Sequence, residues 1–415
     1  MDLAARRREF WALEKRVNGH RLAYLDSAAT TLVPRVVIEA VTEALATMGN
    51  AGRGVHAMAQ AANDAIDRAR FTVSSALTAW PIDPPLDKPS RPGLSADEIV
   101  FTSSTTASVN LVADAWGHLA VREGDVVIAS EAEHHSNLLP WQRLCRDQEA
   151  RFVLARVDDA GRFDLGAFEA QVKEYGERVK LVAIGHVSNV LGTVAPIADI
   201  ARIAHSVGAL VFVDGAQAMP HLDVDVRELA CDFYAFSGHK VYAMQGAGVL
   251  WGRRELLQEM PWWQIGGGTV TTVEPDHAVW REIPARFEAG TPNTPALVAL
   301  STALEWAHRV PVRADEARAH EALRSVIRDA GARVIGEPEV GVVSFAWDYH
   351  PHDIASIADG EGVALRSGHH CAQLVHRRFG VDASTRASVG MYTNLDDVEQ
   401  LGRALAKVRK VLGPR

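Results

Sequence analysis

The segment LVFVDGAQA (210–218), followed after a short connection by FYAFSGHK (233–240), decides the fold class. Each segment begins with an unbroken run of β-branched, aromatic and other apolar residues and ends in glycine and polar residues, which is the pattern of a short buried strand. Such runs are typical of parallel strands that helices cover on both faces. Ligands of these sheets bind beyond the carboxyl ends of the strands. Asp214 and Lys240 stand at two such ends and are therefore candidates for a site.

Five further short apolar runs between residues 99 and 251 alternate with longer stretches of helical periodicity. This alternation predicts an α/β domain with a mostly parallel seven-stranded sheet flanked by helices. The predicted strands are Ile99–Phe101, Val126–Ala129, Phe152–Ala155, Leu181–Ile184, Leu210–Val213, Phe233–Phe236 and Gly248–Trp251. The predicted helices between them are Ala107–Leu119, Leu138–Gln148, Leu165–Tyr175 and Ile197–Ser206.

The pattern changes after residue 290, where long helical stretches surround one clear strand, Val342–Phe345. These stretches are Pro295–His308, Arg313–Asp329 and Asp396–Leu412. We expect a smaller α+β domain that also receives the N-terminal helix. The predicted large domain spans residues 26–290, and the small domain spans residues 1–25 and 291–415. Within the large domain, Trp80–Pro92 carries five prolines in thirteen residues, so we expect an exposed loop there.

The chain has 415 residues, with 43 Lys and Arg against 52 Asp and Glu, a formal net charge of −9 and 47% hydrophobic residues. These values are typical of a folded globular protein, and the acidic balance speaks against nucleic-acid binding. No apolar run approaches the ~18 residues of a membrane span, and the first residues lack the apolar stretch of a secretory signal, so we expect no membrane association. Cys145, Cys231 and Cys371 are odd in number and far apart, which fits reduced thiols and a cytoplasmic location.

Polar residues follow two earlier predicted strands. The hydroxyl-rich segment Thr102–Thr106 precedes a predicted helix, where free backbone N–H groups suit a phosphate; an ordinary N-cap is the alternative. His134 and His135 are adjacent, so on any regular element their side chains point in different directions, and we expect at most one of them to face a site. Metal binding is the alternative there, but no second set of ligands at suitable spacing stands nearby, so we predict no metal site.

Asp214 and Lys240 are the candidate reactive residues after the predicted strands Leu210–Val213 and Phe233–Phe236. A buried carboxylate needs a partner or a ligand, although a helix-capping role for Asp214 fits the sequence equally well. Burial and cationic neighbours in the turn Ser237–Lys240 lower the pKa of a lysine, and a neutral lysine forms Schiff bases; a solvated surface lysine is the alternative.

A phosphate-binding helix N-terminus, a histidine that stacks on a ring, a buried carboxylate and a lysine in a turn are together the groups that bind pyridoxal phosphate (PLP). Neither G-x-x-x-x-G-K-[ST] nor G-x-G-x-x-G occurs, which speaks against a nucleotide.

Eight motifs occur in an order and spacing that resemble the type II (SufS/CsdA, NifS-like) cysteine desulfurases, a group of the class V aminotransferase family of PLP fold type I. They are LDSAAT (25–30), TTASVNLVA (105–113), EHHSNLLPWQ (133–142), HVSNVLGT (186–193), VDGAQA (213–218), DFYAFSGHK (232–240), RFEAGTPNT (286–294) and RSGHHCA (366–372). The resemblance covers nearly the whole chain. It implies the PLP-dependent transferase fold, with the large α/β domain binding the cofactor and the small α+β domain carrying the Cys371 loop.

The resemblance also implies roles for individual residues. Around the cofactor these are Lys240 as the Schiff-base lysine, Asp214 at the ring nitrogen, Gln217 near the ring hydroxyl and His134 on the ring face. The implied phosphate ligands are Thr105, Thr106, Ser237 and His239, with Thr291 reaching across from the second subunit of a homodimer. The residues implied near the substrate are Arg386 and Asn189 at the carboxylate, together with His56 and Arg366.

Cys371 determines the reaction that the resemblance implies. A cysteine is usually an inert packing residue, and we interpret Cys145 and Cys231 in that way. Cys371 instead follows Arg366-Ser-Gly-His-His, a polar and partly cationic stretch that stabilises a thiolate. In the family this cysteine takes the sulfur of PLP-bound L-cysteine as a persulfide, L-alanine is released, and the sulfur passes to an acceptor protein or thiol. The implied catalytic residues are therefore Lys240, Cys371 and His134.

Two alternatives stay open from the sequence. One is another class V PLP enzyme, such as a selenocysteine lyase, cysteine sulfinate desulfinase, epimerase or aminotransferase, in which Cys371 is dispensable. The other is a non-catalytic PLP-fold protein, against which the intact Lys240, Asp214 and Cys371 speak. Departures from the family pattern, such as Met244-Gln245 after the lysine, leave open whether the sulfur serves general iron–sulfur cluster assembly or a dedicated biosynthetic pathway.

Overall fold

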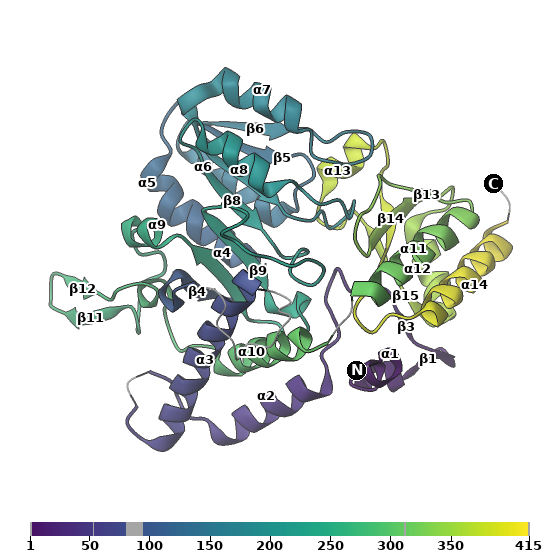
Figure 1. Cartoon of the computed structure of the whole chain (residues 1–415), viewed down its shortest axis with the longest axis horizontal. Coiled ribbons are helices and arrows are strands. Elements are labelled where there is room, and N and C mark those ends of the chain that lie inside the picture. Colours follow the sequence, from purple (N-terminus) through teal and green to yellow (C-terminus); the bar gives the residue numbers. More distant parts are fainter. Residues whose placement is uncertain (1, 53, 80–93, 311–312, 414–415) are drawn as a thin grey trace.

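The computed structural model describes residues 2–52, 54–79, 94–310 and 313–413 of the chain. Its centre is a seven-stranded sheet in the order β4-β10-β9-β8-β7-β5-β6 (Figure 1). Among the strands described in this sheet, β10 alone runs antiparallel to its neighbours, so the prediction of a mostly parallel seven-stranded sheet is confirmed. The strands are β4 (Ile99–Thr102), β5 (Val126–Ser130), β6 (Arg151–Ala155), β7 (Val179–Gly185), β8 (Leu210–Asp214), β9 (Phe233–Ser237) and β10 (Gly248–Gly252).

Helices cover both faces of this sheet (Figure 1), as the unbroken apolar strands predict. Alternate residues of β5 show the two layers, because successive side chains of a strand point to opposite faces. Val126 and Ile128 belong to one core and Val127 and Ala129 to the other. The first core includes residues of α3 (Ala57–Ala79), α7 (Leu165–Tyr175), α8 (Ile197–His205) and α10 (Thr294–His308). The second includes residues of α4 (Thr105–Val112), α6 (Leu139–Asp147) and α9 (Arg254–Glu259).

Helix α4 begins two residues before the predicted start at Ala107. The side chain of Ser104 accepts a hydrogen bond from the backbone N–H of Ala107 and caps the helix. Beyond Val112 the helix widens into a π-type segment, Ala113–Gly117, and ends in the short α5 (His118–Ala120). The earlier start places Thr105 in the first turn, whose backbone N–H groups have no acceptor within the helix itself.

A second, four-stranded antiparallel sheet in the order β13-β14-β17-β16 packs against three further helices (Figure 1). Leu323, Phe345 and Leu405 contribute to the core between them. Of these strands the sequence predicted β14 alone, because the segments RSG and STRAS contain no apolar run. The elements are β13 (Arg333–Val334), β14 (Val342–Ala346), β16 (Arg366–Gly368), β17 (Ser384–Ser388), α11 (Arg313–Asp329), α12 (Pro351–Gly360) and α14 (Leu395–Leu412).

The remaining described elements lie outside these two sheets. A parallel pair, β3 and β15, brings the N-terminal segment to the four-stranded sheet, while α10 packs against α2 and α3 beside the central sheet. The domain limits at residues 26 and 290 stay a prediction, and the predicted loop Trp80–Pro92 lies outside the described residues. No helix in the described ranges is long and apolar enough to cross a membrane. The elements are α1 (Leu3–Arg7), β1 (Arg16–Val17), β2 (His20–Arg21), β3 (Ala23–Tyr24), α2 (Arg35–Thr47), β11 (Val270–Val273), β12 (Ala278–Trp280), β15 (Val363–Ala364) and α13 (Gln373–Arg378).

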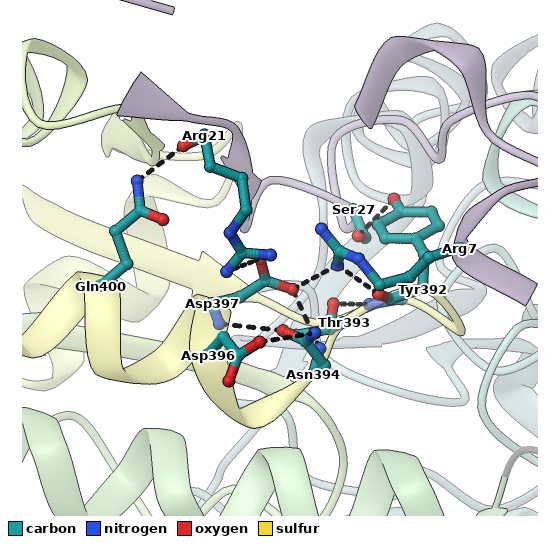
Figure 2. Close-up of polar contacts among 10 residues, drawn as sticks. Arg7, Arg21, Ser27, Tyr392, Thr393, Asn394, Asp396, Asp397 and Gln400 are labelled. Carbon is teal, nitrogen blue, oxygen red and sulfur yellow. Dashed lines mark hydrogen bonds and ion pairs between the residues drawn. The ribbon is translucent and has the colours of Figure 1, made fainter. Parts of the chain in front are cut away.

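A polar cluster fastens the N-terminal segment to the start of α14 (Figure 2). The guanidinium of Arg7 donates to the carboxylate of Asp397 and to the carbonyl oxygen of Tyr392, both at 2.6 Å. Arg21 forms a second ion pair with Asp397 at 3.0 Å. The hydroxyl groups of Tyr392 and Ser27 lie 2.7 Å apart. Because the Asp397 side chain is only 2% exposed, water does not compete strongly for these contacts, and they fix the chain that leads into residues 25–30.

Replacing Asp397 by alanine is expected to lower the free energy of unfolding by about 3 kcal/mol, because it leaves the partly buried guanidinium of Arg7 without its counter-ion. It also removes the bond that the backbone N–H of Asn394 donates to this carboxylate. Urea unfolding followed by circular dichroism measures the change. The matched control is Glu399→Ala on the exposed face of α14, which should cost less than about 0.5 kcal/mol. Equal losses in the two variants would contradict an anchoring role for Asp397.

Candidate active site

A cavity of about 550 Å³ lies at the carboxyl end of the central sheet, where the four-stranded part of the chain meets it. Twelve of the fourteen site residues predicted from the sequence line it. They are Thr105, Thr106, His134, Asn189, Asp214, Gln217, Ser237, His239, Lys240, Arg366, Cys371 and Arg386. The other two, His56 and Thr291, are exposed and do not line the cavity of their own chain in the described structure. Residues that are far apart in sequence thus converge on one site, and their individual roles stay predictions.

The first turn of α4 forms one wall of the cavity. The backbone N–H of Thr105 donates to the hydroxyl of Ser237 at 2.8 Å, and the two hydroxyl groups lie 2.7 Å apart. The hydroxyl of Thr106 lies 2.7 Å from that of Ser136. Gly248 of β10 allows this packing, because a Cβ there would come within 2.4 Å of the backbone nitrogen of Ser104. The result is a group of hydroxyls around a helix N-terminus, which suits an anion.

Lys240 and Asp214 carry the opposite charges of the site. Burial lowers the pKa of Lys240 to about 8, and the nearby charge of Asp214 acts against this shift. Burial raises the pKa of Asp214, which Lys240 and a hydrogen bond from the backbone N–H of Ala216 counteract. Gly215 follows the strand directly because a Cβ there would lie 2.1 Å from the ring of Tyr234. Lys240 therefore has an amine that releases its proton near neutral pH, opposite a buried carboxylate.

His134 and His135 both line the cavity, so the expectation that at most one of them faces a site is wrong. The argument from regular elements does not apply, because these residues begin a single 3-10 turn, His135–Asn137, instead of a helix or strand. Burial lowers the pKa of His134 to about 3, so its imidazole is neutral, and its Nδ1 accepts from the backbone N–H of Ser136. A neutral ring can stack on an aromatic ligand without introducing a charge.

Glu133 is a buried group beside the cavity that the sequence reasoning missed. Its carboxyl oxygens accept from the backbone N–H of Gly185 at 2.8 Å and from the side-chain amide of Asn137 at 2.7 Å. Burial, with a smaller contribution from the charge of Asp214, raises the pKa of Glu133 to about 8, although these hydrogen bonds act against the rise. The EHHSN motif placed it beside the site, but nothing in the sequence distinguished it from a surface carboxylate.

The Cys371 loop is fixed against the central-sheet side of the cavity. The backbone N–H of His135 donates to the carbonyl of Cys371 at 2.7 Å, and the side-chain amide of Asn189 donates to the carbonyl of His370 at 2.7 Å. His370 and Cys371 have φ angles of 50° and 55°, in the left-handed region, which costs roughly 1 kcal/mol or more per residue. These contacts hold the turn in that conformation, and the side chain of Cys371 remains exposed.

Arg386 of β17 closes the cavity on the other side. It is almost completely buried, and burial lowers the pKa of its guanidinium while the charge of Asp26 opposes the shift. Its Nη1 donates to the carbonyl of Asn189 at 3.0 Å, and its Nη2 lies 3.2 Å from the carboxylate of Asp26. Asp26 belongs to the LDSAAT motif, but its ion pair with Arg386 could not be deduced from the sequence because 360 residues separate Asp26 from Arg386.

Comparison with known proteins places this site in a family. The sequence profile described as Aminotransferase class-V matches residues 23–401. The cysteine desulfurase of Shigella flexneri is 39% identical over 416 residues, which cover 98% of each chain. A cysteine desulfurase of Synechococcus elongatus is 38% identical over 98% of this chain, which spans 64% of that longer relative. The chain belongs to the cysteine desulfurases of the class V aminotransferase family. The predicted family, and with it the predicted enzyme class, are confirmed.

Solved structures of cysteine desulfurases agree with this membership. The apo cysteine desulfurase of Thermococcus onnurineus NA1 has a TM-score of 0.89 and 34% sequence identity, with 99% of each chain covered. The cysteine desulfurase CsdA of Escherichia coli has a TM-score of 0.87 and 33% identity over 99% of each chain. The predicted PLP-dependent transferase fold of this desulfurase is therefore confirmed.

The cofactor of this desulfurase is pyridoxal phosphate, and the residues present fit it. Lys240 offers an amine that loses its proton readily, and Asp214 offers a buried carboxylate. Nδ1 of His239 is buried without a hydrogen-bond partner in the described structure, and His239 lines the same cavity as the hydroxyls at the start of α4. A buried polar atom needs a partner, and a phosphate would provide one. Within the described ranges no group of three His, Cys, Asp or Glu side chains is placed to hold a metal ion.

The buried histidines predict how stability depends on pH. Burial lowers the pKa of His370 to about 2, and its Nε2 lies 3.0 Å from the hydroxyl of Ser384. Because the unfolded chain takes up this proton near pH 6.5 and the folded chain does not, stability falls as the pH drops below 6.5. In His370→Gln the loss of unfolding free energy between pH 6.5 and 4.5 should be smaller by about 2 kcal/mol.

Urea unfolding of the cofactor-free protein at a series of pH values measures this difference. The control, His352→Gln, changes an exposed histidine of α12 and should leave the pH dependence of the wild type unaltered. A parallel pH dependence in His370→Gln and the wild type would show that His370 takes up a proton as readily in the folded state as in the unfolded chain.

Proposed function

We propose that this desulfurase converts L-cysteine to L-alanine in the cavity and that Cys371 receives the sulfur as a persulfide. The observation that carries this proposal is that Lys240 and Cys371, 131 positions apart in the sequence, line the same cavity. The loop of Cys371 is held at this cavity by hydrogen bonds from His135 and Asn189.

Lys240 would hold the cofactor, which when bound would supply an electron sink for the α-carbon of the amino acid. Asp214 would keep a proton on the ring nitrogen, Gln217 would lie near the ring hydroxyl, and His134 would cover the ring face. The phosphate ligands would be Thr105, Thr106, Ser237 and His239. Pre-positioned donors of this kind lower the cost of charge development in the transition state.

Lys240 would act as the base that removes the α-proton of the substrate. Its pKa of about 8 leaves a substantial neutral fraction at neutral pH, so Nζ can take the α-proton of the substrate. Arg386 and Asn189 would bind the substrate carboxylate, with Arg366 and His56 nearby. Arginine suits this task because its guanidinium forms paired hydrogen bonds with a carboxylate.

Cys371 would then accept the sulfur. Its Sγ attacks the sulfur of the bound substrate, an S–S bond forms as the C–S bond breaks, and the electron pair of that bond stays with the organic fragment. Proton uptake by this fragment gives L-alanine, and the persulfide remains on the protein. The sulfur next passes to an acceptor protein or thiol, for which the exposed position of Cys371 leaves access.

The desulfurase would act as a homodimer in the cytoplasm. Thr291 and His56 are exposed and lie outside the cavity of their own chain, which is the placement expected of residues that complete the site of a second subunit. Trp262, Val273 and Val279 are large apolar side chains exposed on or beside the β11–β12 hairpin, and contact with another subunit would cover them. Iron–sulfur cluster assembly is the general use of the mobilised sulfur that we propose.

Replacing Lys240 by alanine is expected to abolish alanine formation, at least a thousandfold below the wild type, because the proton-transfer group and the covalent link are both lost. Borohydride reduction followed by mass spectrometry should find no cofactor attached to the peptide of residues 232–253. Lys180→Ala, a change at a partly exposed lysine of β7, is the control and should keep both activity and attachment. Alanine formation at the wild-type rate by Lys240→Ala would refute the assignment.

Replacing Cys371 by serine is expected to reduce alanine formation from cysteine by more than a hundredfold, while the cofactor still binds, because serine cannot accept the sulfur. Mass spectrometry after brief exposure to cysteine should find a sulfur adduct on the Cys371 peptide of the wild type. The control Cys145→Ala removes a buried thiol outside the cavity and should keep the adduct. Full activity of Cys371→Ser would instead favour a class V enzyme that releases its product without a persulfide.

A further inference from the structure

The turn that carries His135 is fixed to the central part of the fold from two sides. Just before it, the carboxyl group of Glu133 accepts a hydrogen bond from the backbone N–H of Gly185 in β7 at 2.8 Å. Just after it, the hydroxyl of Ser136 lies 2.7 Å from that of Thr106 in α4. The turn is thus tied to a strand of the central sheet and to a helix that covers it.

Helix α13 begins two residues after Cys371 and has no side-chain cap of its own. Ala372 occupies the N-cap position, and its methyl group cannot accept a hydrogen bond. The first N–H groups of a helix have no acceptor within the helix. The segment that follows the thiol therefore needs an acceptor from another element.

His135 provides that acceptor and a second contact. The backbone N–H of Gln373, the first residue of α13, donates to Nε2 of His135 at 3.3 Å. The backbone N–H of His135 donates to the carbonyl of Cys371 at 2.7 Å. One residue of the turn thus binds the loop at Cys371 and again two residues later. Cys371 has a left-handed φ of 55°, which such external contacts stabilise.

The imidazole of His135 is in the state that these contacts need. A ring nitrogen that accepts a hydrogen bond carries no proton, so the neutral ring has its proton on Nδ1. Burial and the nearby His369 lower the pKa of His135, which favours the neutral ring at neutral pH.

We propose that His135 is a positioning residue for sulfur transfer, whose backbone N–H and imidazole together hold Cys371 at the cavity and cap α13. This inference rests on the proposed role of Cys371 as the sulfur acceptor. It gives the two adjacent histidines separate tasks. His134 would cover the cofactor ring, and His135 would hold the loop of the thiol that reacts with the substrate.

Three replacements of His135 test the proposal in the holoenzyme. Glutamine places an amide oxygen where Nε2 lies and can accept from Gln373, whereas the shorter asparagine ends near the position of Nδ1, and alanine has no acceptor. In His135→Ala and His135→Asn we expect kcat for alanine formation to fall about tenfold, because the thiol is less well placed. In His135→Gln it should stay within about threefold of the wild type.

Substrate binding separates this effect from general damage to the fold. The KM for cysteine and the dissociation constant of L-alanine should stay within about threefold of the wild type in all three variants, because Arg386 and the cofactor site are unchanged. Steady-state kinetics and isothermal titration calorimetry measure these constants. His118→Ala is the matched control: it removes an exposed imidazole outside the cavity, which contacts the carbonyl of Asp114, and should leave all values unchanged.

Hydrogen exchange measures the hold on the loop without turnover. In His135→Ala and His135→Asn the amides of residues 372–378 should exchange about tenfold faster than in the wild type, and in His135→Gln at nearly the wild-type rate. Mass spectrometry of the peptides follows the exchange. Failure of the wild type to form alanine from cysteine would refute the proposed function, while the exchange rates would still decide whether His135 holds the loop.

Three results would overturn the proposal. The first is an unchanged rate of exchange in His135→Ala. The second is an equal loss of kcat in His135→Gln and His135→Ala, because the acceptor at the position of Nε2 would then be irrelevant. The third is a rise in KM that accompanies the loss of kcat together with a lower melting temperature, which would leave His135 a purely structural role.

Discussion

A buried amine, Lys240, and a buried carboxylate, Asp214, lie at one edge of the sheet, and their burial determines which other groups of the site carry a charge. Lys240 releases its proton near pH 8 because burial disfavours its charge, and Asp214 limits that effect. The low-dielectric surroundings do not favour a second carboxylate charge nearby. Glu133 accordingly has a pKa of about 8 and holds a proton at neutral pH, so a single negative charge faces the amine. The neutral His134 and His239 follow from the same burial.

The central sheet could be predicted closely because its strands are decided by local sequence. LVFVD and FYAFS are long enough and apolar enough to be recognised singly, and their boundaries shift by two residues at most. The strands β16 and β17 could not be recognised in this way. Their residues RSG and STRAS are polar or small, and they form strands through pairing: β17 pairs with β14, whose sequence VVSFA is apolar, and β16 pairs with β17. Tertiary pairing decides their structure, so single-sequence patterns do not show it.

The sequence predicted most of the residues that line the site, but it did not predict the hydrogen bonds and ion pairs between them. The strand-end rule located Asp214 and Lys240, and the resemblance to a family added Cys371, Arg386 and others that now line one cavity. Glu133, His135 and Asp26 were missed because their importance lies in their contacts. His135 acts through its backbone N–H, and Asp26 through a side chain 360 residues distant in sequence. Neither kind of contact leaves a periodicity or spacing in the chain.

These contacts connect Arg386, the proposed carboxylate ligand, to the loop of Cys371, the proposed sulfur acceptor. Asp26 contacts Arg386, Arg386 donates to the carbonyl of Asn189, and the side chain of Asn189 donates to the carbonyl of His370, the residue before Cys371. A carboxylate bound at Arg386 is thus three hydrogen bonds from the loop that presents the thiol. Because the loop holds two residues in left-handed backbone conformations, it depends on such external contacts to keep its shape. Arg386, the proposed ligand of the substrate carboxylate, therefore also supports the position of Cys371, the proposed sulfur acceptor.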